Sequence, residues 1–363
     1  MRLVWGTVTA VEQEATGFQL LGVAPDGGDS GLAICYPALC GTCSEGDRVL
    51  LNTTAVGLGL GTGGRHFVVA RADGIRGVAF DDASGGHIMK LRYTPMQRDV
   101  LSVESPESPH HAVMSQARTL DGMPVVCCGL HSQLPLAAAS IKQFDPSLRI
   151  AYCMTDAASL ALPLSDVVRS CVSAGLLDMT VSCGQAFGGQ LEAVNLHSGM
   201  LAARHVARAD VAIVAIGPGV VGTATPLGHG GVAQGEAINA VAALGGTPVA
   251  ALRVSFADTR ERHRVVSHHT LAALTSIALA PALVAVPALP PDLAEQVDAR
   301  LADAGVWQRH RRAQAARPHG DAPDLRGIAV TTMRRGPAED PAFFSAAYAA
   351  GEIAARIARG EAF

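Results

Sequence analysis

Residues 211–219 read VAIVAIGPG, and the apolar run Val211–Ile216 stops at the turn Gly217-Pro218-Gly219. A short run of apolar, mostly β-branched residues that ends in glycine and proline is typical of a strand buried on both faces of a sheet. Further apolar runs occur before and after this one, and segments of helical period separate them. Together with Val211–Ile216, we expect strands at Pro124–Cys128, Arg149–Cys153, Met179–Cys183, Pro248–Val254, Leu283–Val286 and Gly327–Thr332.

Strands that alternate with helices in this way predict a parallel sheet with helices on both faces. About seven such units follow residue 123, so the fold class is α/β with a mostly parallel, Rossmann-like sheet of about seven strands. A (β/α)8 barrel requires one more strand and is the weaker alternative.

The first part of the chain has a different pattern. Residues 1–104 carry short β-prone runs between turns rich in glycine and aspartate, which predicts an N-terminal β-rich barrel or sandwich domain. These runs are Leu3–Val11, Phe18–Val23, Gly31–Tyr36, Arg48–Asn52, Phe67–Ala70 and His87–Tyr93. Residues 105–122 begin with prolines and serines and are expected to form an extended linker, followed by the α/β domain over 123–363.

The composition limits the class of protein. Apolar residues make up 49% of the 363 residues, enough for a large core, and the net charge of −4 argues against a broad nucleic-acid-binding surface. Eight cysteines are too few for a disulfide scaffold, and Glu12 and Glu14 interrupt any secretory signal, so we expect a cytoplasmic protein. The uncharged stretch Leu271–Leu289 contains Ser276 and Pro281, which favour a buried helix and strand over a membrane span.

Chemistry is expected at one edge of the sheet, because every loop that leaves the carboxyl end of a parallel strand reaches the same edge. The loops on this edge carry histidine, aspartate, arginine and glycine. We expect catalytic groups at His131, Asp258, His263, His268 and His269. We expect ligand-binding groups at Gln133, Asp156, Gly217, Gly219, Gly222, Arg260 and Arg264.

The pair His268 and His269 is the most specific functional candidate on this edge. Ser267 is a typical N-cap, which places both rings in the first turn of a helix. The helix dipole disfavours a positive imidazolium there, so a neutral ring can bind a metal or exchange a proton. Neighbouring helical residues point about 100° apart, so one of the two rings is expected to face a ligand. The structural alternative is that both rings make ordinary surface contacts.

Other candidates also have structural explanations. The charged run 258–264 is typical of a solvated loop, and Asp156 is typical of a helix N-cap. The glycine loop from Gly217 to Gly231 favours close approach of an anion, but it matches neither a P-loop nor the dinucleotide fingerprint.

The cysteines are weaker candidates. Cys183 follows a strand at a turn that would stabilise a thiolate, yet its apolar context favours a place in the core. Cys35, Cys40 and Cys43 have a metal-like spacing with no fourth ligand near them in the sequence.

These motifs together resemble the DUF3866 family, bacterial proteins of unknown function and similar length. The resemblance rests on Leu51–Val56, Gly61–Gly64, Gly129–Gln133, Gly184–Gly189 with Leu191–Asn195, Gly217–Thr223, and Ser255–Asp258 through Ser267–His269. It implies one architecture over nearly the whole chain and supplies no reaction. Neither Cys183 nor His229 is a fixed position of the family pattern, so the resemblance lowers both as catalytic candidates.

The leading hypothesis is an enzyme, or an enzyme-like binder, for a small anionic ligand that bears phosphate or carboxylate. The histidines would supply acid–base groups or the ligands of a divalent metal, and a hydrolase or transferase is favoured over an oxidoreductase. The alternative is a non-enzymatic regulator that senses a metabolite, with the β-rich domain binding a partner or nucleic acid. The apolar helix expected at Phe343–Ile357 packs either on the sheet or on a second subunit, and we favour a homodimer.

Overall fold

The computed structural model describes residues 1–59, 63–73 and 85–363, so Gly61 and Thr62 of the motif Gly61–Gly64 lie outside the described residues. The chain splits into two units, Met1–Val100 and Leu101–Phe363, and each is described by itself. The segment expected to be a linker belongs to the second unit. It contains the short helix α3 (His111–Met114), and its residues Met114 and Leu120 are buried in the core of that unit.

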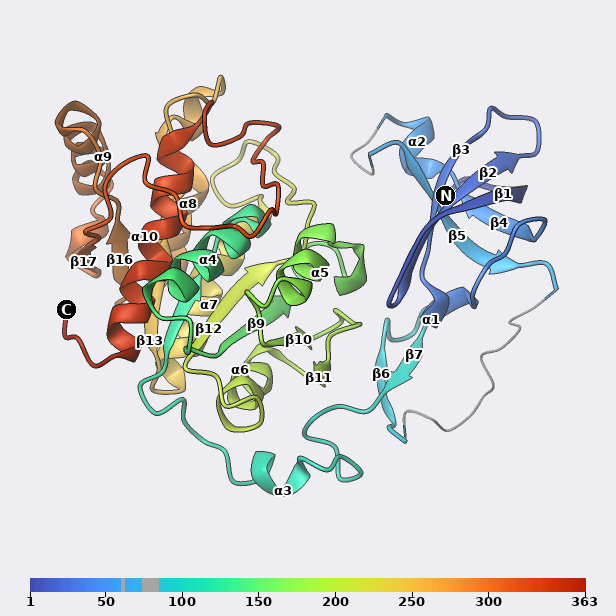
Figure 1. Ribbon diagram of the computed structural model, residues 1–363, viewed down its shortest axis with the longest axis horizontal. Helices are drawn as coiled ribbons and strands as arrows, with labels where there is room; N and C mark the ends of the chain where they lie inside the picture. Colours follow the sequence, from blue (N-terminus) through green and yellow to red (C-terminus); the bar gives the residue numbers. More distant parts are fainter. Residues whose placement is uncertain (60–62, 74–84) are drawn as a thin grey trace. The chain divides into compact units, whose positions relative to one another are not determined.

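The first unit is a closed five-stranded barrel, so the expectation of a barrel or sandwich resolves to a barrel (Figure 1). The strand order is β1-β2-β3-β5-β4, and β3 and β5 are parallel while the other pairs are antiparallel. The strands are β1 (Leu3–Ala15), β2 (Phe18–Pro25), β3 (Gly31–Cys35), β4 (Arg48–Asn52) and β5 (Arg65–Arg71). Alternate residues such as Val49 and Leu51 point inward and fill the barrel.

Short elements accompany the barrel. Helix α1 (Pro37–Cys40) follows β3, and α2 (Thr54–Gly57) follows β4. A separate antiparallel pair, β6 (Ile88–Lys90) and β7 (Arg98–Val100), ends the unit.

The second unit is built on an eight-stranded sheet in which every neighbouring pair is parallel. The order is β11-β10-β9-β12-β8-β13-β16-β17, which confirms the Rossmann-like α/β fold. The bounds are β8 (Pro124–Cys127), β9 (Ile150–Thr155), β10 (Met179–Cys183), β11 (Leu191–Ala193), β12 (Val211–Ile216), β13 (Thr247–Ala251), β16 (Leu283–Val286) and β17 (Arg311–Gln314).

One expected strand is absent from this sheet. Two strands that were not expected, β11 and β17, form the two edges of the sheet. Residues 327–332 form irregular chain that pairs only through an isolated bridge between Thr332 and Arg335. Strand β17 carries exposed arginines and β11 is three residues long. Edge strands face solvent and need no apolar run, so a search for apolar runs passes over them.

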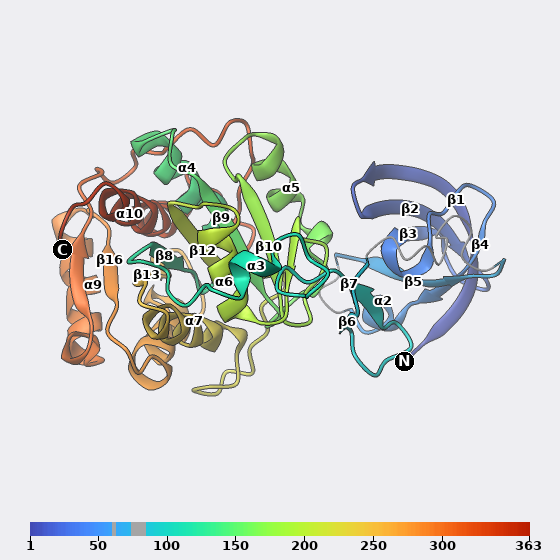
Figure 2. The same ribbon diagram turned by 90° about the horizontal axis from the view of Figure 1, so that it is seen from below.

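Helices cover both faces of the sheet (Figure 2). On one face lie α4 (Leu134–Phe144), α5 (Asp166–Ser173) and α10 (Pro341–Ala358). On the other lie α6 (Leu196–His205), α7 (Ala233–Ala243), α8 (His268–Ala272) with the π-helical turn η5 (Ala273–Ile277), and α9 (Pro291–Asp303). The residues of α10 from Ala342 to Ala355 are buried against α4 and the sheet, so this helix gives no argument for a second subunit.

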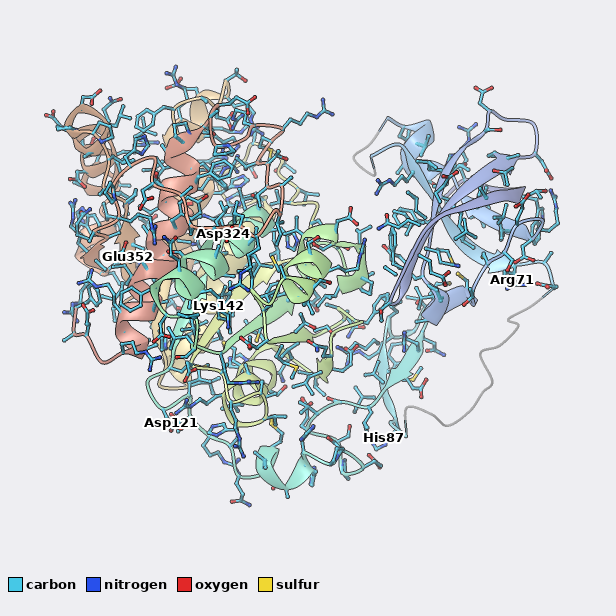
Figure 3. All side chains as sticks on the ribbon, in the orientation of Figure 1. Arg71, His87, Asp121, Lys142, Asp324 and Glu352 are labelled. Carbon is cyan, nitrogen blue, oxygen red and sulfur yellow. The ribbon has the colours of Figure 1, made fainter. Side chains whose placement is uncertain are left out.

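Two charged side chains of the helical layer, Lys142 and Glu352, are buried and have hydrogen-bond partners; both are labelled in Figure 3. The Lys142 ammonium donates to Leu148 O and lies 2.9 Å from the carboxylate of Asp178. The Glu352 carboxylate accepts hydrogen bonds from two backbone amides, at Ala316 and Arg317.

The uncharged stretch Leu271–Leu289 divides between α8, η5 and β16, as its serine and proline predict. Within residues 1–59, 63–73 and 85–363, no helix has both the length and the apolarity that crossing a bilayer requires.

The order of the strands fixes where a ligand can bind. After β8 the chain turns to α4 on one face, whereas the neighbouring strands β12 and β13 lead to α7 and α8 on the other face. Loops that leave adjacent strands toward opposite faces open a crevice at the carboxyl edge. The two cavities described below lie along this edge.

Candidate functional site

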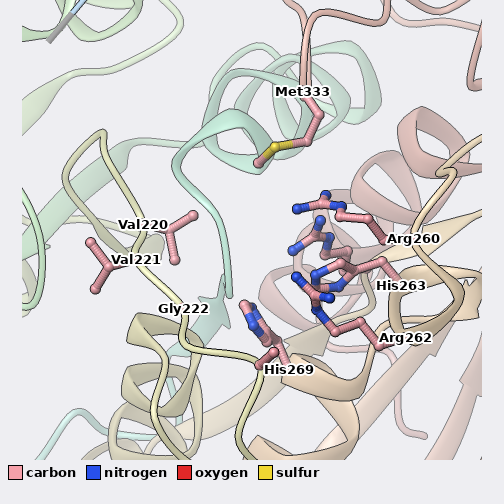
Figure 4. Close-up of a pocket in the computed structure, with 10 residues that line it drawn as sticks. Val220, Val221, Gly222, Arg260, Arg262, His263, His269 and Met333 are labelled. Carbon is pink, nitrogen blue, oxygen red and sulfur yellow. The ribbon is translucent and has the colours of Figure 1, made fainter. Parts of the chain in front are cut away.

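A cavity of about 190 Å³ lies at the carboxyl edge of the sheet (Figure 4). Arginines and histidines project into it from one side, and Val220, Val221 and Met333 face them. Its lining residues are Val220, Val221, Gly222, Ala224, Arg253, Arg260, Arg262, His263, His269 and Met333.

The loop after β13 supplies most of the polar lining. Two short antiparallel strands, β14 (Val254–Ser255) and β15 (Val265–Val266), close this loop at its base. The turn η4 (Glu261–His263) then carries Arg262 and His263 into the cavity. The closed base holds these side chains on a short, defined segment of backbone.

Asp258 is the centre of an arginine cluster. Its carboxylate is 2% exposed and lies 2.8 Å from Arg260, 3.4 Å from Arg335 and 3.5 Å from Arg253. Burial alone would raise the pKa of Asp258, but hydrogen bonds from Arg260 and the charge of Arg253 outweigh burial and hold this pKa well below its usual range. Asp258 is therefore a charged structural anchor for the arginines, and it is not placed to exchange protons near neutral pH.

The arginine cluster carries excess positive charge. Arg335 also pairs with Asp340 at 3.0 Å, and Arg262 lines the cavity as a further cation. Three guanidinium groups thus pair with two carboxylates and Arg262 adds a fourth positive charge, so the formal charge of the set is +2. Burial lowers the pKa of Arg253 to about 10, so its guanidinium stays charged at neutral pH.

Four histidines gather beside the arginines. His229 comes from the loop after β12, His263 from the loop after β13, and His268 and His269 begin α8. The Ser267 hydroxyl accepts a hydrogen bond from the His269 amide, which confirms Ser267 as the N-cap of α8. His269 lines the cavity and is 8% exposed, whereas His268 is half-buried beside it.

The histidines stay neutral near pH 7. Burial, followed by the charge of Arg253 and other neighbours, lowers the pKa of His263 to about 3. Burial, followed by the nearby His229 and Arg253, lowers the pKa of His269 to about 2. Burial is also the main reason why the pKa values of His229 and His268 lie below the ordinary histidine value.

Three of these rings have a buried nitrogen with no hydrogen-bond partner. These atoms are Nδ1 of His229, Nε2 of His268 and Nδ1 of His269. His263 differs, because its Nδ1 lies 2.7 Å from the Ser267 hydroxyl. Since that hydroxyl already accepts from the His269 amide, its own hydrogen can point at Nδ1 of His263, which leaves the ring proton on Nε2.

Glycines allow the loop after β12 to approach the histidines. Residues 222–229 form a hairpin that is closed by a bridge between Gly222 and His229. A Cβ atom at Gly222 would lie 3.4 Å from Nε2 of His269, and a Cβ atom at Gly231 would lie 3.0 Å from Nδ1 of His229. These glycines therefore keep the space around the ring nitrogens free.

A second cavity of about 300 Å³ shares Val220 and Met333 with the first. It is lined by Leu130, His131, Ser132, Val167, Gly217, Pro218, Gly219, Val220, Val330, Thr331, Thr332 and Met333. The expected site residues His131, Gly217 and Gly219 belong to this second cavity. Both ring nitrogens of His131 are occupied, because Nδ1 donates to Ile216 O and Nε2 lies 2.7 Å from the Ser165 hydroxyl.

The structure brings together six of the residues expected from the sequence around the arginine cavity: Gly222, Asp258, Arg260, His263, His268 and His269. Gln133, Asp156 and Arg264 lie outside both sets of lining residues. Gln133 is fully buried and bonds to the backbone of Gly129, Leu130 and Leu252. Asp156 accepts from the Gln185 amide, and Arg264 is exposed.

Several site residues were not expected. His229 lies in the histidine cluster although the resemblance lowered it as a candidate. Arg262 was considered only as part of the charged run 258–264, and Arg253, Met333 and Arg335 were not considered. The sequence contains one indication that Arg253 has a function, because Arg253 is the only charged residue in the apolar run from Pro248 to Val254. The sequence contains no such indication for Met333 and Arg335, since they follow residues 327–332, which were expected to form a strand.

The cysteines lie away from this site. Cys183 is buried in the main core, close to Gly199 of α6. In the barrel, the Sγ atom of Cys35 lies 3.5 Å from that of Cys40 and 3.8 Å from that of Cys43, and all three side chains are buried.

One comparison with known proteins gives a match. The model of the family described as "Protein of unknown function (DUF3866)" matches residues 32–351, which include β3 to β5 of the barrel, the sheet and both cavities. No curated protein and no solved structure matches the chain.

Proposed function

The chain belongs to the DUF3866 family, and we propose that it is an enzyme, or an enzyme-like binder, for a small anionic ligand whose phosphate or carboxylate occupies the arginine cavity. The observation that carries this proposal is the excess charge of +2 around a cavity of about 190 Å³. Guanidinium groups that outnumber their carboxylate partners at a cavity attract an anion, because arginine forms paired hydrogen bonds with phosphate and carboxylate oxygens.

The charge favours a phosphate monoester over a simple carboxylate. A phosphate monoester carries about −1.5 to −2 charges near pH 7, close to the charge that the arginine cluster leaves uncompensated. Arg253 supports this choice, since a largely desolvated cation interacts with a dianion more strongly than a solvated cation does. The neighbouring cavity that contains His131 and Val330 would hold the rest of the ligand.

His263 is the residue that we expect to exchange protons in the occupied site. With its proton on Nε2, the ring donates to an anion in the cavity. The pKa of His263 is low partly because Arg253 and Arg260 repel a positive ring, after the larger effect of burial. A bound anion offsets those charges and raises this pKa, which brings His263 toward the range useful for acid–base catalysis.

A hydrolase or transferase fits these groups better than an oxidoreductase. Arginines stabilise the charge that develops on a phosphoryl or acyl group during transfer, and a neutral imidazole can move the proton of the leaving group. None of the eight cysteines, all of which the structure describes, is part of a disulfide, which fits the reducing cytoplasm, where we place this activity.

Methylphosphonate, a stable analogue of a phosphate monoester, tests the proposal. Its effect on the melting temperature is measured in EDTA-containing buffer, beside acetate and succinate, for the wild type and for Arg262→Gln. Arg262 is exposed, so its replacement leaves the fold intact while it removes one cavity charge. We expect methylphosphonate to raise the melting temperature of the wild type most, and Arg262→Gln to lose most of that rise.

The outcomes separate the proposed function from the alternatives. A wild type whose melting temperature responds to none of the three anions contradicts the proposal. A larger rise in melting temperature with succinate than with methylphosphonate indicates that the ligand bears carboxylate and not phosphate. Binding of methylphosphonate without turnover of any phosphate monoester in a screen favours the regulatory protein that senses a metabolite.

A further inference from the structure

We propose that His229, His268 and His269 bind a divalent transition-metal ion, such as Zn²⁺, with an open coordination position toward the arginine cavity. Among the residues that the structure describes, these three form a cluster in which one ring nitrogen of each lies within 4.8 Å of the others. The metal half of this inference stands on the histidines alone, and only the role of the anion rests on the proposed function.

The first argument is the unsatisfied state of the rings. A buried polar nitrogen without a partner destabilises the folded state, and such atoms are rare in folded proteins. Here three neighbouring histidines each have one. His229 and His269 are 5% and 8% exposed, so bulk water is not their partner. A metal ion would satisfy the lone pairs of all three rings at once.

The second argument is the orientation of His229. Its Nε2 lies 3.1 Å from Pro226 O, so this nitrogen carries the proton and donates. The lone pair is therefore on Nδ1, the atom without a partner. A histidine ligand commonly donates its other ring N–H to a backbone carbonyl in this way, which fixes the tautomer that can bind a metal.

The third argument is the chemistry of the donor set. Neutral imidazole suits zinc, copper, iron and nickel, and three histidines with an open position are the ligand set of a catalytic zinc site. Gly222 and Gly231 leave the ring nitrogens uncovered. The open position would face the cavity, because His269 lines it.

Binding requires one ring to turn. His229 and His269 are nearly parallel, with planes 6° apart, and parallel stacked rings cannot both direct a lone pair at one ion. Zn–N bonds of about 2.0–2.1 Å place the nitrogens of a tetrahedral site roughly 3.3 Å apart. The nitrogens must therefore approach by about 1.5 Å from their largest separation of 4.8 Å, which rotation of a side chain supplies.

The arginines make the metal and the anion bind cooperatively. Positive charge at Arg253 opposes a bare cation near the histidines, as it opposes their protonation. An anion in the cavity offsets that charge and can complete the coordination of the metal. By linkage, methylphosphonate must then tighten metal binding by the same factor by which the metal tightens methylphosphonate binding.

The test is a titration of the EDTA-stripped, dialysed full-length protein with Co²⁺ and Zn²⁺. Co²⁺ binding is followed by its visible absorption, and Zn²⁺ binding by competition with a chromogenic chelator. The proteins are the wild type, His229→Gln, His268→Gln, His269→Gln and, as the matched control, His197→Gln, which replaces an exposed histidine of α6. Chemical denaturation of each apoprotein verifies that the variants fold.

We expect the wild type and His197→Gln to bind one equivalent, and each cluster variant to lose at least roughly tenfold in affinity. Methylphosphonate should strengthen Co²⁺ binding to the wild type and have less effect on Arg262→Gln. The inference is overturned if the folded wild type binds neither metal, or if the folded cluster variants bind as tightly as the wild type. Neither outcome affects the anion proposal, which the melting-temperature experiment tests separately. Metal binding that methylphosphonate does not change supports the metal site and removes its coupling to the anion.

Discussion

The imidazole rings of His229 and His269 stack face to face, with centroids 3.7 Å apart and planes 6° from parallel. Such stacking excludes a charge on both rings at once, since two imidazolium ions at this separation would repel each other strongly. The two residues are brought together by the loop after β12 and the start of α8, at the carboxyl edge of the sheet. The stack therefore depends on the topology of the whole α/β unit.

Replacement of Arg253 by glutamine should weaken anion binding more than replacement of any exposed arginine. Its side chain is 4% exposed and lies 3.5 Å from Asp258, so its loss removes a desolvated charge from the cavity wall. We expect at least a tenfold loss in methylphosphonate affinity, and about 1–3 kcal/mol lower stability from the unsatisfied groups. Calorimetric titration and urea denaturation measure the two effects.

Arg264→Gln is the matched control for Arg253→Gln. Arg264 is exposed and does not line either cavity, although the sequence suggested it as a ligand-binding residue. Its replacement should leave affinity and stability close to the wild type. Equal losses in the two variants would show that net charge, and not the cavity, attracts the anion.

Asp258→Asn should destabilise the protein even though it removes a negative charge from a chain of net charge −4. The carboxylate is 2% exposed and lies within 3.5 Å of three arginines, and its loss leaves the buried Arg253 without its paired carboxylate. We expect a cost of about 3–5 kcal/mol in the free energy of unfolding, measured by urea denaturation.

Asp298→Asn provides the comparison for Asp258→Asn. Asp298 pairs with Arg312 on the surface, where both side chains are largely exposed. The pair should contribute less than about 1 kcal/mol. A loss at Asp258 no greater than the loss at Asp298 would contradict its role as the anchor of the arginine cluster.

Stability should fall as the pH drops from 7 toward 4, in part because of His131. Burial lowers the pKa of His131 to about 4, whereas an unfolded histidine has a pKa near 6.5. Between these values the unfolded chain binds a proton that the folded chain does not, so lower pH favours unfolding by up to about 1.4 kcal/mol per pH unit. Urea denaturation of the metal-free protein across this range measures the slope.

His131→Gln isolates this contribution. The variant lacks the titrating ring, so its free energy of unfolding should depend less on pH below pH 6.5 than that of the wild type. The two curves should approach each other as the pH falls. His197→Gln, at an exposed position, should keep the wild-type slope. Parallel curves for His131→Gln and the wild type would mean that His131 titrates normally in the folded protein.

Gly231→Ala should weaken metal binding without a charge change. The added Cβ would lie 3.0 Å from Nδ1 of His229 and 2.9 Å from Cβ of His269, which crowds the proposed ligand atom. We expect at least a tenfold loss in Co²⁺ affinity. Gly28→Ala in the barrel is the control, because its added Cβ would meet only the Pro25 side chain at 3.7 Å. Unchanged Co²⁺ binding by Gly231→Ala would remove Nδ1 of His229 as a ligand.

The fold was predictable where burial dictates the residue types. Strands β8, β9, β10, β12, β13 and β16 are buried on both faces and are nearly continuous apolar runs, so the sequence revealed each of them. The edge strand β17 carries arginines and was missed. The segment 327–332 was mistaken for a strand because isoleucine and valine suit irregular chain over a cavity as well as they suit a sheet.

The site was predictable only in part, because the parallel sheet indicates which loops meet but not which side chains turn inward. The loop after β13 yielded Asp258, Arg260 and His263. In that same loop Arg262 points into the cavity, while Arg264 lies exposed outside it. Arg262 lies on the turn η4, whereas Arg264 follows that turn with extended backbone, and composition does not reveal this difference. Met333 and Arg335 reach the site by tertiary packing alone.

Asp340, which is 1% exposed, joins Arg335 to the Ser255 hydroxyl just before α10 covers the sheet. Asp340 therefore ties the start of α10 to the arginine cluster around Asp258. Proteolytic cleavage before Asp340 would leave Arg335 without one of its two carboxylate partners and would separate α10 from the sheet that it covers.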